Sequence, residues 1–170
     1  MPYILLFLFT VGADQWLKYW TVHHLEVGQS MPFIPHIMQL QRLHNYGAAW
    51  SSFSGQKWLL IGVTAVLLTV MLVLMVRKVV RHPLGLMACT LIFTGGVGNL
   101  IDRVRMGYVV DMFHFEFWPS YPVFNVADIC VVIGAILGSV YYLWLYEKYD
   151  VKQKPVEEEL TDGETDAPTE

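Results

Sequence analysis

The chain has 170 residues, of which 55% are hydrophobic, and its mean hydropathy is +0.43. This length allows at most one sizeable domain and excludes a large multidomain enzyme, while the hydropathy is high for a soluble protein. The net charge is -4, but residues 157–170 hold seven acidic side chains, so residues 1–156 carry eleven basic against eight acidic ones. We expect no nucleic-acid partner.

Four segments have the apolar character of membrane spans, which take about 20 mostly apolar residues each. The predicted fold is an all-α membrane protein, a bundle of four transmembrane helices in one domain over residues 1–150. The predicted helices cover residues 2–20, 57–77, 83–104 and 122–146, joined by outer loops over residues 21–56 and 105–121. The first helix includes Asp14 and Lys18, whereas the other three are built on uncharged stretches.

The first predicted helix also resembles the apolar core of a secretory signal peptide. Val11-Gly12-Ala13 is a small-residue sequence of the kind found at cleavage sites. No Lys or Arg precedes it, whereas such peptides usually begin with positive charge. The pattern therefore favours a retained helix, with cleavage as the alternative.

The loop between the second and third helices predicts the orientation in the membrane. It carries Arg77, Lys78, Arg81 and His82 and no acidic residue, and short basic loops lie on the cytoplasmic side. With four helices, both termini are then cytoplasmic and the two longer loops face outward. Residues 151–170, polar and acidic, are predicted to form a disordered cytoplasmic tail.

Two segments of the outer loops alternate apolar and polar residues, the pattern typical of strands. They are Met38–Gln41 and Phe113–Phe117. We expect a short sheet, a small extracytoplasmic β element. Its apolar side either rests in the headgroup region or simply caps the bundle.

Polar side chains gather at the outer ends of the predicted helices, where their high cost marks a candidate functional site. Asp14 and Lys18 are four residues apart and can pair on one helix face. The other members of the set are Asn99, Asp102, Arg103, Asn125 and Asp128. Two pairs, Asp14–Lys18 and Asp102–Arg103, also fit a purely structural role as ion pairs that hold helices together.

Asp111 and Asp128 differ from the other polar residues because no cation is near them in the sequence. Two carboxylates brought together at low dielectric share a proton, as in aspartic peptidases. One then activates a water molecule while the other, protonated, polarises a carbonyl group. The spacing permits this pairing but does not establish the distance between the two groups.

Two other classes of function remain open from the residues alone. A small transporter or proton pathway also places acids and Arg inside a bundle, although here the inner halves of the helices are apolar. A metallopeptidase would have to use histidines outside the helices, and the sequence contains no HExxH motif. Those histidines are His23, His24, His36, His44 and His114.

Five motifs in order closely resemble the bacterial lipoprotein signal peptidases, also called signal peptidase II. They are ADQWLK (13–18), NYGAAW (45–50), GGVGNLIDR (95–103), VVDM (109–112) and FNVAD (124–128). The resemblance implies an aspartic endopeptidase of the bacterial cytoplasmic (inner) membrane with its active site at the outer leaflet. It implies cleavage of prolipoproteins just before a diacylglyceryl-modified cysteine, by a monomer in contact with membrane lipids and without metal or cofactor.

The resemblance also implies a role for each matching residue. Asp111 and Asp128 correspond to the catalytic dyad. Asn45 corresponds to a substrate or inhibitor contact, Asn99 and Arg103 to holders of the substrate backbone, and Asn125 to a support for the second aspartate. Asp14, Lys18 and Asp102 correspond to structural or supporting positions. The sequence departs from the common pattern at Trp50, Met112 and Ile129, which are expected to alter packing in the pocket.

Overall fold

The computed structural model describes residues 1–48 and 52–151. The predicted acidic tail from residue 152 onward and the departure at Trp50 lie outside the described residues. The elements, in chain order, are α1 (Pro2–His24), β1 (Ser30–Ile34), β2 (Met38–Asn45), α2 (Lys57–Val76), α3 (Pro83–Met106), β3 (Val109–Phe115), α4 (Val126–Trp144) and a π-helical turn at Glu147–Val151.

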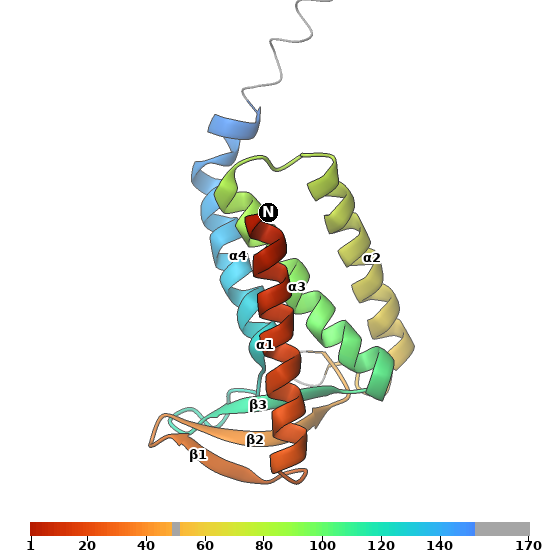
Figure 1. Ribbon diagram of the computed structural model, residues 1–170, viewed down its shortest axis with the longest axis vertical. Coiled ribbons are helices and arrows are strands. Elements are labelled where there is room, and N and C mark those ends of the chain that lie inside the picture. Colours follow the sequence, from red (N-terminus) through yellow and green to blue (C-terminus); the bar gives the residue numbers. More distant parts are fainter. Residues whose placement is uncertain (49–51, 152–170) are drawn as a thin grey trace, which may run out of the picture.

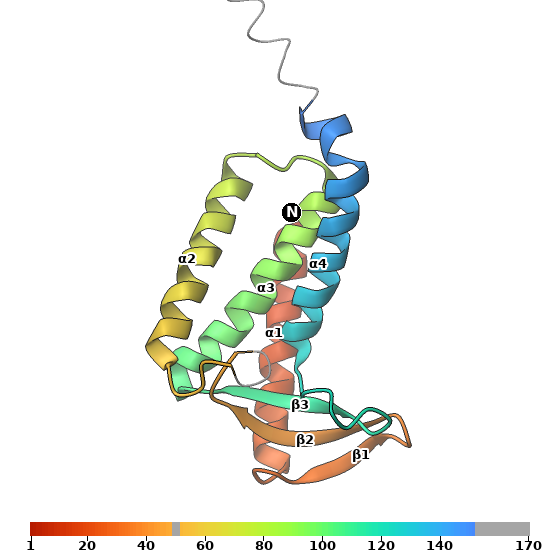
Figure 2. The same ribbon diagram turned by 180° about the vertical axis from the view of Figure 1, so that it is seen from behind.

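The long helices form a bundle with the sheet across one end (Figure 1). Helices α1, α3 and α4 pack against one another, and α2 packs against α3 (Figure 2). Glycines let the helices approach closely, as small residues do in membrane bundles. A Cβ atom on Gly98 would lie 2.7 Å from Oδ2 of Asp14, and one on Gly134 would lie 2.7 Å from Cγ1 of Ile92.

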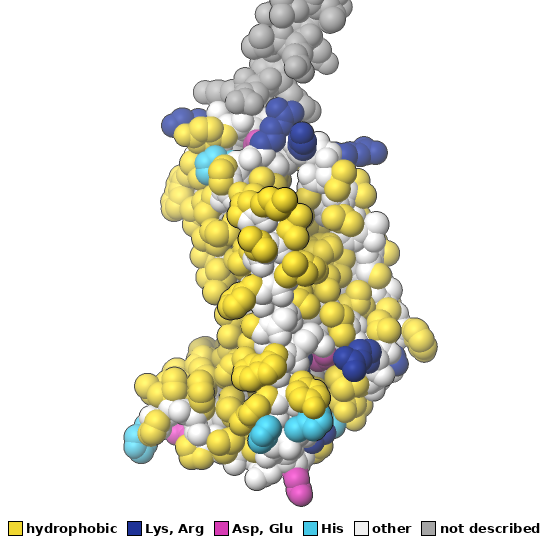
Figure 3. Space-filling view, viewed as in Figure 1, with side chains coloured by type: hydrophobic (Ala, Val, Ile, Leu, Met, Phe, Trp, Pro, Cys, Tyr) yellow, Lys and Arg dark blue, Asp and Glu magenta, His cyan; other side chains and the backbone are white. Residues whose placement is uncertain are grey.

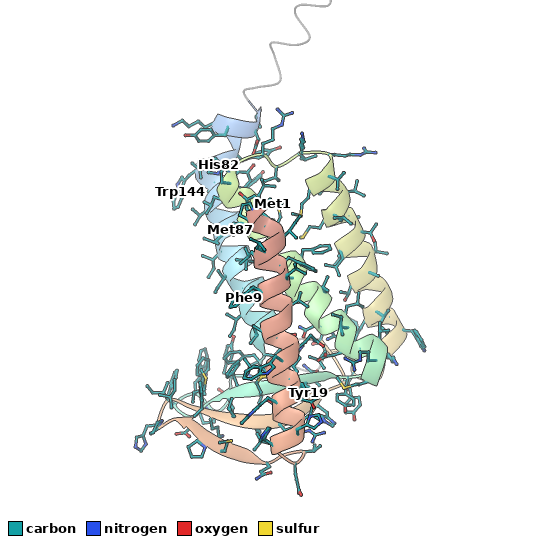
Figure 4. The ribbon with its side chains drawn as sticks, viewed as in Figure 1. Met1, Phe9, Tyr19, His82, Met87 and Trp144 are labelled. Carbon is teal, nitrogen blue, oxygen red and sulfur yellow. The ribbon has the colours of Figure 1, made fainter. Side chains whose placement is uncertain are left out.

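Three helices, α2, α3 and α4, are long and apolar enough to cross a membrane. Helix α1 has 23 residues, but Asp14, Gln15 and Lys18 make its second half more polar. Hydrophobic side chains cover the shaft of the bundle, and Lys and Arg gather at the end opposite the sheet (Figure 3). Exposed aromatic residues occupy both ends, with Tyr19 beside the sheet and Trp144 at the far end (Figure 4), as in membrane-interface belts.

The sheet is antiparallel in the order β1-β2-β3. The predicted strand at Met38–Gln41 is confirmed as part of β2, and Phe113–Phe115 as part of β3. Strand β1 was not predicted because its sequence does not alternate and contains Pro32, a residue tolerated at a sheet edge. Asp111, placed in a loop by the sequence, lies in β3.

Helix α4 begins at Val126, four residues later than predicted. Its expected first turn is instead extended, because Phe124 exchanges two backbone hydrogen bonds with Phe113, of 2.8 and 3.0 Å. The other predicted ends differ by four residues or fewer. Helix α1 continues to His24, and α3 continues to Met106, where Gly107 ends it in the left-handed conformation with φ 87°.

Candidate functional site

Asp111 lies in the middle of β3 and is 1% exposed. Its Oδ1 accepts a hydrogen bond of 2.6 Å from Nδ2 of Asn125, and its Oδ2 accepts one of 3.0 Å from Nδ2 of Asn45. Strand pairing places Leu43 opposite Asp111, so Asn45, two residues further along β2, shares its face of the sheet. Burial and the nearby Asp128 carboxylate raise the pKa of Asp111 from 3.8 to about 7, although the two amide hydrogen bonds oppose this shift.

Asp128 lies in the first turn of α4, where it forms a capping box with Asn125. The backbone N–H of Asn125 donates to its Oδ2 at 3.0 Å, and the Asp128 N–H donates to Oδ1 of Asn125 at 3.0 Å. Such reciprocal bonds satisfy donors that a helix N-terminus leaves free. Asn99, from α3, donates to Oδ1 of Asp128 at 2.8 Å. Both oxygens of Asp128 therefore accept N–H groups.

Asn125 connects the two carboxylates. It is fully buried, and its side-chain N–H groups donate to Asp111 and, at 3.1 Å, to Oδ1 of Asn99, while its Oδ1 caps α4. The sequence placed Asn125 inside the first turn, whereas it is the N-cap residue itself. The spacing between Asn125 and Asp128 thus fixes both the start of the helix and the position of one carboxylate.

A buried ionic cluster between α1 and α3 adjoins these residues. Nζ of Lys18 is 2.9 Å from Oδ2 of Asp14 and 3.1 Å from Oδ2 of Asp102, and it donates to Oδ1 of Asn99 at 3.0 Å. The predicted Asp14–Lys18 pair is confirmed. The suggested pair between Asp102 and Arg103 is wrong, because neighbouring helix residues point in different directions and Asp102 faces α1 instead.

Arg103 extends toward the loop after β2. Its guanidinium donates to the carbonyl of Gly47 at 2.7 Å and to that of Asn99 at 3.4 Å. With Asp111 and Asp128 it lines a cavity of about 310 Å³. The remaining wall residues of this cavity are Asn45, Ala48, Asn99, Val109, Tyr121, Pro122, Val123, Phe124, Val131 and Val132. The cavity thus joins a polar wall to an apolar one.

All nine residues singled out from the sequence lie in this region, but the contacts of two other residues, Gln15 and Gly47, were missed. Gln15 donates to Asp102 at 3.1 Å and to the carbonyl of Gly98 at 3.2 Å, which links α1 to α3. It was overlooked because it is uncharged, although an amide inside a predicted span is also costly to bury. The backbone carbonyl of Gly47 leaves no signal in a sequence. Of the departures, Met112 is fully buried and Ile129 is 37% exposed.

Four of the five histidines considered as metal ligands have other partners. His23 and His24 bond to backbone carbonyls of their own helix, His114 bonds to Gln39, and His44 stacks on Tyr108. Burial and the nearby Arg42 lower the pKa of His44. Within residues 1–48 and 52–151, no group of three or more His, Cys, Asp or Glu side chains is placed to hold a metal ion.

Fold and site together define a helical membrane protein with two carboxylates, Asp111 buried and Asp128 half-buried, on one amide-lined cavity. The family model for signal peptidase (SPase) II matches residues 6–144. The chain therefore belongs to the signal peptidase II family.

Similar proteins agree with this assignment. The chain is 38% identical to a lipoprotein signal peptidase of Enterococcus faecalis, covering 83% of this chain and 87% of that protein. It is 41% identical to one of Streptococcus agalactiae, covering 81% and 88%. A bacterial membrane enzyme solved by the in meso method at 2.3 Å resolution has a TM-score of 0.79 at 31% identity, covering 92% of this chain and 94% of the other. A second, solved at 1.9 Å, has a TM-score of 0.78 at 32% identity, covering 85% and 94%.

Proposed function

We propose that the chain is an aspartic endopeptidase that removes signal peptides from prolipoproteins, cutting just before the diacylglyceryl-modified cysteine. The observation that carries this proposal is the pair of carboxylates, Asp111 and Asp128, linked by Asn125 on the wall of one cavity. Membership of the signal peptidase II family supports the substrate class. The enzyme acts as a monomer and uses no metal or cofactor.

The two carboxylates have different surroundings, which suggests different roles. Each carboxylate accepts two N–H groups, but Asp128 also lies at the N-terminus of α4, where the helix dipole favours negative charge. Asp111 has a pKa raised to about 7 by burial and by the Asp128 charge, so it holds a proton in mildly acidic solution. Asp128 is therefore the general base, and Asp111 is the general acid.

The reaction then runs in two steps. Asp128 takes a proton from a water molecule whose oxygen attacks the scissile carbonyl carbon, while Asp111 donates its proton to the carbonyl oxygen. In the second step Asp128 gives its proton to the leaving nitrogen and the C–N bond breaks. Asp111 recovers a proton from the former carbonyl oxygen as the new carboxyl group forms. Arg103, Asn45 and Asn99 line the cavity where the peptide backbone binds.

We expect kcat/KM to fall as the pH rises through about 7. A carboxyl group with a raised pKa is protonated below that pKa and loses its proton above it, so the general acid disappears on the alkaline side. The fall is about tenfold per pH unit well above the pKa. Initial rates of prolipoprotein cleavage between pH 5 and 9 measure it. A rate that stays constant up to pH 9 contradicts the role of Asp111 as the acid.

The proposed topology has four transmembrane helices in the bacterial cytoplasmic membrane. The 23 residues of α1 extend for about 34 Å, enough to cross the hydrocarbon core. Basic side chains at the end opposite the sheet support cytoplasmic termini. The sheet and the polar cavity then lie at the outer leaflet, where a lipidated substrate is anchored.

An apolar cavity of about 420 Å³ between α2 and α3 supports the proposal that the substrate carries a lipid. Leu68 and Gly96 form part of its wall, and Val131 lines both this cavity and the polar one. Val131 lies one helical turn beyond Asp128, so the two cavities adjoin at this residue. We infer that this cavity holds an acyl chain of the modified cysteine.

Narrowing the apolar cavity with Leu68→Trp is expected to raise KM for a dipalmitoyl substrate about tenfold while kcat changes little. Excluding two methylene groups from burial costs roughly 1.6 kcal/mol at about 0.8 kcal/mol each. A dibutyroyl substrate is expected to be unaffected, and Val66→Trp, at a 62% exposed position outside this wall, is the matched control. Equal KM changes for both substrates contradict the assignment of the acyl site.

A transporter or proton pathway is the alternative from a different class. It requires a polar track across the bundle. Between the site and the opposite end, the buried polar side chains among the described residues are Thr90 and Thr94, which are 4% and 1% exposed. Both donate to carbonyls of their own helix, at 2.7 Å. They offer no chain of exchangeable protons, and peptide hydrolysis is the better proposal.

The proposed function is tested with the purified protein and one prolipoprotein prepared with and without its diacylglyceryl group. We expect the lipidated form alone to be cut, at the same rate with and without EDTA. Loss of cleavage on chelation points to a metallopeptidase instead. Absence of cleavage, combined with proton flux in sealed vesicles, points to the proton pathway.

A further inference from the structure

Lys18 has a function beyond pairing with buried acids. We propose that it is a positioning residue that fixes the orientation of the Asn99 amide and thereby keeps Asp128 ionised as the general base. This inference rests on the proposed function. It follows from the contacts of the Lys18 ammonium group and the Asn99 amide.

All three N–H donors of Lys18 have partners. They point to Oδ2 of Asp14 at 2.9 Å, to Oδ2 of Asp102 at 3.1 Å and to Oδ1 of Asn99 at 3.0 Å. Lys18 is only 3% exposed, and it lies one residue before Tyr19 at the sheet end of α1 (Figure 4). A buried ammonium with three acceptors is held firmly, because losing any one of them leaves a donor unpaired.

The ammonium group determines which end of the Asn99 amide faces which neighbour. Lysine donates but never accepts, so the atom that faces it must be the amide oxygen. The amide nitrogen is then directed to Oδ1 of Asp128, 2.8 Å away. In the flipped orientation NH₂ would face the ammonium group and an oxygen would face the carboxylate, two repulsive contacts. Asn125 adds to this preference by donating to the same oxygen of Asn99.

The arrangement matters for Asp128 because its two oxygens then accept only N–H groups, and these stabilise the ionised form. The charges around the two carboxylates come from three elements. They are Asp14 and Lys18 on α1, Asp102 and Arg103 on α3, and Asp111 on β3. The hydrogen bonds of Arg103 run to the carbonyls of Gly47 and Asn99. Lys18 is thus the cation that acts through the hydrogen-bond partner of Asp128.

A structural ion pair alone does not account for the contact with Asn99. Asp14 is also held by the backbone N–H of Ala127 at 2.9 Å, and Asp102 by that of Val110 at 3.1 Å. These bonds anchor α1 and β3 independently of the amide. The third N–H donor of Lys18 points to Asn99, the hydrogen-bond partner of Asp128. Loss of this hydrogen bond affects activity in a way that loss of the two ion pairs does not.

The test compares pH profiles of kcat/KM for Lys18→Met and for Lys18→Met/Asp102→Asn. The double variant removes one positive and one negative charge, so the buried charge stays balanced and folding is preserved. The acidic limb of this profile is the range in which Asp128 becomes protonated. We expect it to move to higher pH by one unit or more in both variants. The thermal midpoint is expected to be lower in Lys18→Met and to recover in the double variant. Lys57→Met, a lysine at the same end of the bundle, is the matched control and keeps the wild-type profile.

A double variant whose acidic limb coincides with that of wild type overturns the inference, because balancing the charge has then restored the profile and Lys18 is only a structural partner. If Lys18→Met alone fails to fold, the double variant decides. Asp128→Asn separates the two proposals. An active Asp128→Asn enzyme defeats the dyad itself, whereas an inactive one with an unchanged Lys18 profile defeats only the inference.

Discussion

Replacing Asp128 or Asp111 with Asn is expected to lower kcat/KM for prolipoprotein cleavage by roughly 10³-fold or more. Each carboxylate performs a proton transfer in both steps, and a general acid or base alone contributes about 10²–10⁴-fold. The groups act as a unit, so the double variant loses little more than either single one. Rates are measured with purified protein in detergent on a diacylglyceryl-modified substrate.

The control for this prediction is Glu26→Gln, which neutralises an exposed carboxylate at the sheet end of the molecule. It is expected to retain wild-type kcat/KM. Asn has nearly the shape of Asp and keeps an acceptor for the N–H of Asn125, but its NH₂ group then faces the NH₂ of Asn99. The Asp128→Asn protein is therefore expected to fold with a thermal midpoint lowered by about a few degrees. Robust cleavage by either Asn variant would remove Asp111 and Asp128 from the mechanism.

Asn125→Ala is expected to have the second large effect, on activity and stability together. It removes the N-cap of α4, which costs about 1–2 kcal/mol, and it takes away the donor to Asp111. With Asp111 no longer tied to the start of α4, the two carboxylates lose their common holder. We expect kcat/KM to fall about 10²-fold and the thermal midpoint to drop by several degrees.

Asn125→Ser separates these two losses. A serine oxygen caps a helix about as well as an asparagine oxygen, but it is too short to reach Asp111 while it caps. We expect the serine variant to recover most of the thermal stability and little of the activity. If activity returns together with stability, Asn125 acts only as a helix cap and the link between the carboxylates has no catalytic role.

The polar end of the bundle was largely predictable because burying charge in a membrane is costly. Each of Asp14, Lys18, Asn99, Asp102 and Asp128 interrupts an apolar stretch, and the direction of successive helices brings them to the same end. The four-residue spacing predicted the Asp14–Lys18 pair, which the ion pair at 2.9 Å confirms. Period-two alternation likewise predicted parts of β2 and β3.

Contacts between helices and strands could not be predicted from the sequence. The spacing along one helix does not determine which residue faces a neighbouring helix. Arg103 was therefore suggested as the partner of Asp102, whereas the partner is Lys18. The start of α4 was misplaced because Phe124 pairs with Phe113, a contact that depends on tertiary structure. For the same reason the hydrogen bond from the Asn45 amide to Asp111 was not foreseen, and the predicted contact of Asn45 with substrate stays a prediction.

The most direct test of the central claim is mass spectrometry of the cleavage products formed in ¹⁸O-labelled water with EDTA present. A water activated by Asp128 and Asp111 cuts one bond, before the lipidated cysteine, and leaves one ¹⁸O in the carboxyl group of the released signal peptide. We expect those two products and that label with wild-type protein, and uncut substrate with Asp128→Asn. Cleavage at another bond, or equal product from the Asp128→Asn protein, would contradict it.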